Sequence, residues 1–148
     1  MIKIGHVGHD VKVGQNLLKQ SILNSDSNRL SFYKIINPNV NVHTIYTQCD
    51  IKINEIYRMS WTKLRLSAHS LAIESGRWNR RGRGRLPMEE RLCVCGQVQT
   101  ESHIIESCPI SLNVRQKFNV TSVNDLMLQR ADFDVVCAIV HEFLDLYR

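Results

Sequence analysis

The sequence predicts a mainly α-helical fold, and three observations support this prediction. Apolar residues recur at helical spacing in the best-patterned segments, alternating strand patterns are scarce, and 148 residues are enough for one hydrophobic core. We therefore expect a single domain over 1–148. It would hold an N-terminal helix and irregular segment over 1–50, a central block over 51–109 and a helical C-terminal region over 110–148.

The N-terminal half predicts two helices separated by an irregular segment. The first runs from Asp10, which can act as its N-cap, to Asn24. Aromatic and β-branched residues mix over 31–48, which indicates an extended or irregular segment, with a short helix at its start or a strand pair as alternatives. The second helix begins near Lys52–Asn54 and ends before Gly76.

The C-terminal segment has the clearest helical pattern. After a helical turn at Val114–Phe118, one apolar face begins behind Asp132, which can cap the final helix. Cys137 belongs to that face as a small buried residue, whereas His141 is expected to face solvent. The face consists of Phe133, Val136, Cys137, Val140, Phe143, Leu144 and Tyr147. Further expected core residues are Trp61, Leu64, Leu71 and Ile73.

Positive charge is concentrated in one part of the chain. Residues 58–91 contain nine Lys or Arg against three acidic residues, a net +6 in a chain of net +5, so the remainder carries −1. A near-neutral protein with one basic stretch indicates a polyanionic partner, most simply RNA or DNA. The alternative is a solvated arginine loop.

The glycine-rich run "GRWNRRGRGRLP" predicts a flexible basic loop with phosphate-binding side chains. Trp78 can stack on an unpaired base, although a core anchor at the start of the loop is the favoured interpretation. His69, before the loop, either contacts a phosphate or closes the preceding helix. The predicted phosphate contacts are Lys63, Arg65, Arg77, Arg80, Arg81, Arg83 and Arg85.

A cluster of cysteines and a histidine predicts a metal site. Cys93, Cys95, His103 and Cys108 supply three thiolates and one imidazole, which is a complete ligand set for structural Zn²⁺. Gly96 permits a sharp turn after the second cysteine. Thr100 can cap a short helix over 101–107 that presents His103, and Pro109 disfavours helical geometry at Cys108. Buried free thiols and a Cys-x-Cys redox pair are the alternatives.

Compartment and partners follow from what the sequence lacks. No apolar run reaches the roughly 20 residues that span a bilayer, and the N-terminus has no secretory signal. Five cysteines, an odd number, favour a metal or free thiols over a disulfide framework. We expect an intracellular protein, nuclear or cytoplasmic, with no membrane partner.

Two blocks of the sequence resemble a known family. The run "KLRLSAHSLAIESGRW", the arginine-rich loop, "RLCVCGQVQTESHIIESCP" and Arg115 are similar to the C-terminal region of non-LTR retrotransposon reverse transcriptases. In that family a block with Leu-Arg, a His and a Glu-x-Gly-Arg-Trp run precedes a zinc-binding Cys-Cys-His-Cys element. The resemblance covers about residues 56–109, and its motifs occur in the same order.

The resemblance implies a zinc-bearing, nucleic-acid-associated tail of a larger polyprotein, with Cys93, Cys95, His103 and Cys108 as zinc ligands. The chain contains no Tyr-x-Asp-Asp polymerase motif and no acidic cluster downstream. We therefore expect no catalysis by this chain itself and no small-molecule substrate. A zinc-stabilised protein-interaction module and a decayed retroelement fragment without independent function are the alternatives.

Overall fold

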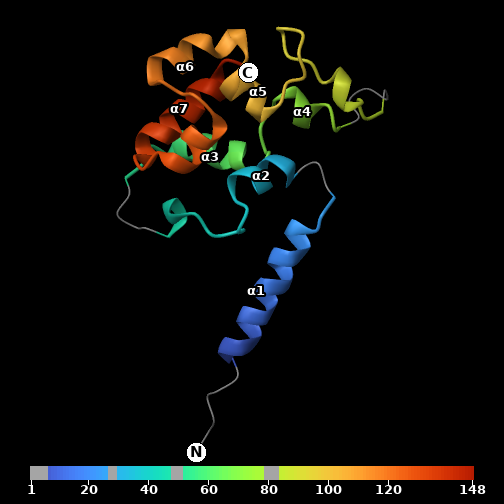
Figure 1. Cartoon of the computed structure of the whole chain (residues 1–148), viewed down its shortest axis with the longest axis vertical. Helices are drawn as coiled ribbons and strands as arrows, with labels where there is room; N and C mark the ends of the chain where they lie inside the picture. Colours follow the sequence, from blue (N-terminus) through green and yellow to red (C-terminus); the bar gives the residue numbers. More distant parts are fainter. Residues whose placement is uncertain (1–6, 27–29, 48–51, 79–83) are drawn as a thin grey trace, which may run out of the picture.

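The computed structural model describes residues 7–26, 30–47, 52–78 and 84–148, with the backbone alone for residues 7–13. Within these residues the chain is helical, and its one β-feature is an isolated antiparallel bridge between Leu92 and Val98 (Figure 1). The predicted mainly α fold is therefore confirmed. None of the described helices is long and apolar enough to cross a membrane.

The first helix, α1 (Val7–Leu23), extends away from the other helices (Figure 1). It begins before Asp10, so the prediction of Asp10 as the N-cap is wrong. Two of its leucines are strongly exposed, Leu17 at 62% and Leu18 at 63%. The second half of α1 nevertheless lies beside the body of the protein, where Lys19 Nζ donates to Asn41 Oδ1 at 3.3 Å.

The segment after α1 forms short helices. α2 (Ser31–Ile36) and η2 (Thr44–Tyr46) occupy the region for which a strand pair is the alternative prediction. The burial of Phe32, Ile36 and Ile45 in the core explains why this region folds back onto the body. The short helix predicted at its start is therefore confirmed.

The long second helix predicted from the sequence is interrupted. α3 (Glu55–Arg65), capped by the Asn54 side chain, ends ten residues earlier than expected, and a separate α4 (Ala72–Ser75) follows. Ser67 adopts a left-handed backbone conformation with φ +51°, which a continuing helix does not allow. The break turns the Ser67 hydroxyl toward Glu101, to which it donates at 3.1 Å.

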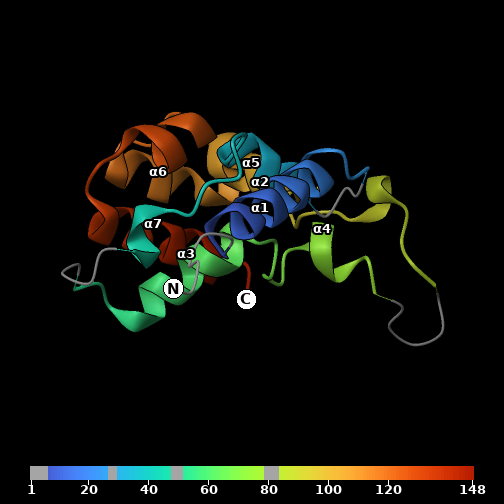
Figure 2. The ribbon, with the colours of Figure 1, turned by 90° about the horizontal axis from the view of Figure 1, so that it is seen from below.

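The core forms where α3 packs against α7 (Phe133–Asp145), and α7 lies between α3 and α6 (Leu112–Phe118) in both views (Figures 1 and 2). Asp132 caps α7 as predicted. His141 does not face solvent as expected, because its Nδ1 lies 2.9 Å from Ser60 Oγ of α3. Most of the expected core residues are buried, while Phe133 and Tyr147 are only partly buried against the core. The buried ones are Trp61, Leu64, Leu71, Ile73, Val136, Cys137, Val140, Phe143 and Leu144. The remaining elements are η3 (Met88–Glu90), α5 (Glu101–Glu106), η4 (Pro109–Ser111) and a π-helical turn at Asp125–Gln129.

Candidate metal centre

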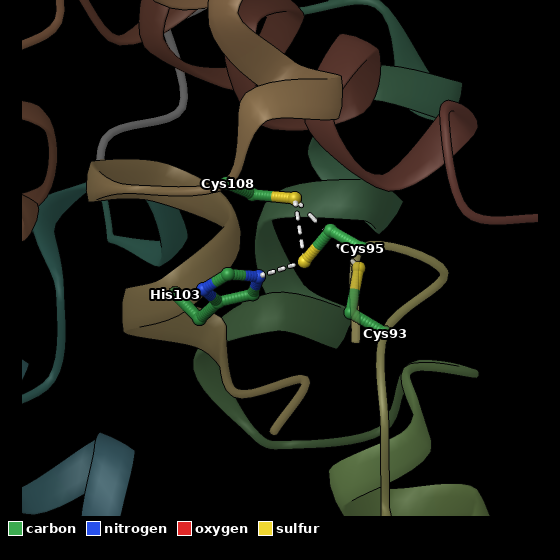
Figure 3. Close-up of side chains that lie close together, drawn as sticks. All are labelled: Cys93, Cys95, His103 and Cys108. Atoms are coloured by element: carbon green, nitrogen blue, oxygen red, sulfur yellow. Dashed lines mark hydrogen bonds between the residues drawn. The ribbon is translucent and has the colours of Figure 1, made fainter. Parts of the chain in front are cut away.

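Four side chains that the sequence singled out converge on one point, as Figure 3 shows. The ligand atoms of Cys93, Cys95, His103 and Cys108 all lie within 4.8 Å of one another. Cys108 Sγ is 3.7 Å from Cys93 Sγ and 3.8 Å from Cys95 Sγ, and Cys95 Sγ is 3.2 Å from His103 Nε2. The four residues are therefore close enough to hold a metal ion.

The sulfur–sulfur distances match coordination and exclude a disulfide. A tetrahedral zinc ion with Zn–S bonds of about 2.3 Å separates its sulfur ligands by about 3.8 Å. A disulfide bond would bring two sulfurs to about 2.05 Å. The cysteines are free, with Cys93 and Cys108 buried and Cys95 partly exposed. The arrangement thus has the dimensions of a Cys₃His metal site.

A small hairpin positions the first two cysteines. The Cys93 N–H donates to the Gln97 carbonyl at 2.7 Å, and the Gly96 N–H donates to the Cys93 carbonyl at 2.8 Å. Gly96 has a φ of +90°, which a residue with a side chain rarely adopts. This turn brings Cys95 beside Cys93 although only one residue separates them, and it confirms the role predicted for Gly96.

The third and fourth ligands come from α5 and the residue that leaves it. Thr100 caps the helix by accepting a hydrogen bond from the His103 N–H at 3.0 Å, as predicted. Cys108 follows the helix in extended geometry, with φ −63° and ψ 127°, immediately before Pro109. The Cys108 N–H donates back to the His103 carbonyl at 2.8 Å. The chain therefore turns at this residue and directs its thiol toward the other ligands.

Hydrogen bonds and burial set the protonation states of the ligands. His103 Nδ1 lies 3.1 Å from Ser107 Oγ, which leaves Nε2 directed at the cluster. Burial, and then the nearby Arg115 guanidinium, lower the pKa of His103, so its imidazole is neutral and able to bind a metal.

The thiols differ from one another. Burial raises the pKa of Cys93 to about 11. Burial also acts against the thiolate of Cys108, but the nearby Tyr147 hydroxyl, the Ile110 backbone and the neighbouring thiols favour the thiolate more strongly and lower the Cys108 pKa. A bound cation favours the thiolate form at both positions, because its charge offsets the cost of burying the anion.

Buried polar contacts join the metal cluster to the preceding block. Gln99 Oε1 accepts from the Ala72 N–H at 2.6 Å, and Arg91 Nη1 donates to the Ile73 carbonyl at 2.8 Å. Glu101 Oε1 lies 3.0 Å from His69 Nε2. The His69 side chain, 2% exposed, is thus buried against Glu101 and does not close α3, which ends at Arg65.

Sequence reasoning missed two residues that support the ligands. Ser107 holds the His103 ring, and Arg115 donates to the Cys108 carbonyl at 2.7 Å. A hydroxyl four residues after a candidate histidine ligand on a helix was the available signal, because residues i and i+4 share one helix face. For Arg115 the only signal in the sequence was its position in the family resemblance.

The structure separates the predicted nucleic-acid contacts into accessible and inaccessible ones. Lys63 and Arg85 are exposed. Trp78 is 62% exposed, so its interpretation as a core anchor is wrong. Arg80, Arg81 and Arg83 lie outside the described residues.

Two of the predicted basic contacts are used inside the protein. Arg65 is 5% exposed, with its guanidinium 5.6 Å from the centre of the Tyr33 ring. Arg77 forms an ion pair with Glu74 at 2.9 Å, and its side chain is 9% exposed. Neither side chain is available to a phosphate on the surface, because each stabilises the packing of its own part of the chain.

No family model, no curated protein and no solved structure matches the chain. The similarity to the retrotransposon reverse transcriptase tail is therefore carried by the motifs alone, and it stays a hypothesis.

Proposed function

We propose that this chain is a structural-zinc, nucleic-acid-binding module similar to the tail of non-LTR retrotransposon reverse transcriptases. The observation that carries the proposal is the convergence of Cys93, Cys95, His103 and Cys108, with sulfur–sulfur distances of 3.7 and 3.8 Å. Three thiolates and one imidazole are a typical structural zinc set. Four protein ligands leave no open coordination position for water or substrate, so the role proposed for the metal is structural.

Zinc would stabilise the part of the fold that has few apolar contacts of its own. The hairpin around Cys93 and Cys95 exposes Leu92 at 50% and Val94 at 91%. Hydrophobic burial therefore contributes little here, and metal coordination supplies the missing free energy. The helix α5, by contrast, is also anchored by Ile104 and Ile105, which are fully buried.

The nucleic-acid part of the proposal rests on charge. The stretch 58–91 carries a net +6, and within it Lys63, Arg85 and Trp78 are accessible. Phosphate contacts of this kind give binding that falls with salt and carries little sequence information.

Zinc binding is tested by elemental analysis of the purified chain and of two cysteine variants. We expect one zinc per chain in the wild type and loss of zinc in Cys108→Ser. Cys137→Ser is the matched control, because Cys137 is equally buried, at 0% exposure, and is not a ligand. Absence of zinc from the wild type, or retention in Cys108→Ser, would contradict the proposal.

Nucleic-acid binding is tested by fluorescence anisotropy with labelled RNA and DNA oligonucleotides over a range of salt. Replacing Arg80, Arg81 and Arg83 by Gln should weaken binding and reduce its salt dependence. For single strands, each phosphate contact that the substitution removes should lower the logarithmic salt slope by about 0.7. Unchanged affinity in this triple variant would show that the loop is not the binding surface.

A protein-interaction module is the second candidate, and the exposed leucines of α1 favour it. Leu17 and Leu18 are neighbours in α1, and they are 62% and 63% exposed. Exposed apolar helix faces commonly bind partner proteins. Retention on an oligonucleotide resin, with elution by salt, distinguishes the candidates, because an interaction module without nucleic-acid affinity passes through.

A further inference from the structure

A cavity of about 640 Å³ is lined by residues of α2, α4, η3 and the start of α5, together with Arg85 and Arg91. Its size is within the usual range for small-ligand pockets, roughly 300–1,000 Å³. Both apolar side chains and arginines line it. The residues that carry the argument are Ile35, Leu86, Met88, Arg85 and Arg91.

Arg91 is a buried cation whose guanidinium is held by backbone carbonyl groups. It is 5% exposed, and its guanidinium donates to the Leu86 carbonyl at 3.1 and 2.8 Å and to the Ile73 carbonyl at 2.8 Å. In the part of the chain that the structure describes, Arg91 forms no ion pair with a carboxylate. A buried charge is costly unless it is paired, so an anion in the cavity would supply the missing counter-charge.

The electrostatic surroundings of Arg91 are positive overall. Burial lowers its pKa first, followed by repulsion from Arg77 and Arg85, while attraction by Glu74 and Glu89 is weaker. The negative charge of Glu74 is already balanced by its ion pair with Arg77.

The one carboxylate that lines the cavity, among the described residues, is already occupied. Glu101 lies 3.0 Å from His69 Nε2 and accepts from the Ser67 hydroxyl at 3.1 Å. Because Arg77 is paired with Glu74, the lining groups that can attract an anion are Arg85 and Arg91.

The rest of the wall suits a flat, weakly polar group. Ile35 is 58% exposed, Met88 49% and Leu86 38%, which is a concentration of accessible apolar surface beside two guanidinium groups. A ligand that combines an apolar ring with an anion matches both parts. In a protein whose basic stretch ends at this cavity, a nucleotide is the ligand with that chemistry.

Resting on the function proposed above, we propose that this cavity binds a single unpaired nucleotide of an RNA or DNA strand. The base would lie against Ile35, Leu86 and Met88, and the phosphate would face Arg85 and Arg91. A base within a duplex is stacked on both faces and cannot enter a concave site, so the strand must be single or locally open.

Two substitutions at the cavity test the proposal on the zinc-loaded full chain, each with a matched control. Ile35→Glu adds a negative charge at the cavity, and Ile56→Glu adds the same charge at an isoleucine that is also 58% exposed but does not line it. Arg85→Gln removes one positive charge from the cavity, and Lys52→Gln removes one from an exposed lysine elsewhere. Affinities are measured by anisotropy with single-stranded RNA, single-stranded DNA and a duplex of the same sequence.

We expect Ile35→Glu to weaken single-strand binding roughly 5- to 150-fold, which is the range for removing the stacking of one base. Both controls should stay within about twofold of the wild type. Arg85→Gln should weaken binding and lower the logarithmic salt slope by about 0.7. The wild type should prefer single strands to duplex, and the RNA and DNA arms identify which strand is favoured.

Each contrary outcome is informative. If the wild type binds single strands but the cavity variants match their controls, the cavity proposal is wrong and the proposed function stands. Equal binding of duplex and single strand would also overturn the unpaired-nucleotide proposal. If the zinc-loaded wild type binds no oligonucleotide, the proposed function fails, and the cavity proposal fails with it.

Discussion

Replacing Gly76 by alanine should destabilise the protein, because the Arg91 side chain lies directly over this glycine. A Cβ at position 76 would be 2.6 Å from Arg91 Cγ and 2.9 Å from both Arg91 Cδ and the Ala72 carbonyl oxygen. The arginine cannot easily move aside, since its guanidinium is held by the Ile73 and Leu86 carbonyls. Overpacking of this kind costs roughly 1–3 kcal/mol, and the entropic gain of Gly→Ala offsets about 0.4–1 kcal/mol.

At the midpoints of these ranges the net loss is about 1.3 kcal/mol, with an upper limit of about 2.6 kcal/mol, and each kcal/mol lowers Tm by roughly 2–4 °C for a domain of this size. Thermal unfolding followed by circular dichroism, with zinc held constant, measures it. Gly14→Ala is the matched control, because Gly14 lies within α1 and a Cβ there meets nothing within 4 Å. Alanine favours a helix, so this control should be neutral or stabilising. A Gly76→Ala variant as stable as the wild type would refute the claim that Arg91 is fixed over α4.

Two further predictions concern histidines. Ser107→Ala should weaken zinc binding roughly 10- to 100-fold in a chelator competition, because the His103 ring loses the hydroxyl that orients it. The control Ser70→Ala changes an exposed serine outside the cluster and should leave the zinc affinity unchanged. Burial, and then the nearby Arg65, lower the pKa of His43 below 6.5, so the folded state favours its neutral imidazole. As the pH falls through 6.5, the unfolded chain takes up a proton at this position before the folded chain does, and the folded state loses stability. His43→Asn, which keeps a capping side chain, should lose less stability than the wild type between about pH 7.5 and 5.5 in denaturant titrations, and parallel pH profiles would contradict this.

The metal cluster was predictable because its signals are local. The turn at Gly96, the cap at Thr100 and the extended Cys108 before Pro109 each depend on backbone rules that act within a few residues. Together these three local features bring the four ligands to one point, so the site could be predicted without knowing how the core packs. The terminal helix was predictable for the same reason, since its apolar face repeats at one period and Asp132 marks its start.

The errors arise where distant parts of the chain determine the local structure. The helix expected to reach residue 75 breaks at Ser67, where Glu101, 34 residues later, provides a buried acceptor for the hydroxyl. The charge pattern predicts that Arg65 lies on the surface, but Tyr33 packs against it. The helical pattern predicts that His141 faces solvent, but Ser60 of a neighbouring helix binds it. The apolar periodicity of one segment carries no information about these partners, because each partner lies in a different segment of the chain.

The same long-range contacts link the metal cluster to the cavity, and this linkage gives the last prediction. The Gln99 N–H donates to the Arg91 carbonyl at 2.8 Å, and the side chain and carbonyl of Gln99 hold the backbone of Ala72 and Ile73. These contacts flank the Cys93–Gln97 turn, so removal of the metal should release both Arg91 and α4.

Chelation of zinc should therefore weaken single-strand binding about as much as the cavity substitutions do, although no ligand of the metal is expected to touch the strand. The effect should disappear in Ile35→Glu, whose cavity is already blocked, because two perturbations of one site are not additive. If chelation and Ile35→Glu instead reduce affinity independently, the metal cluster and the cavity act as separate parts of the surface.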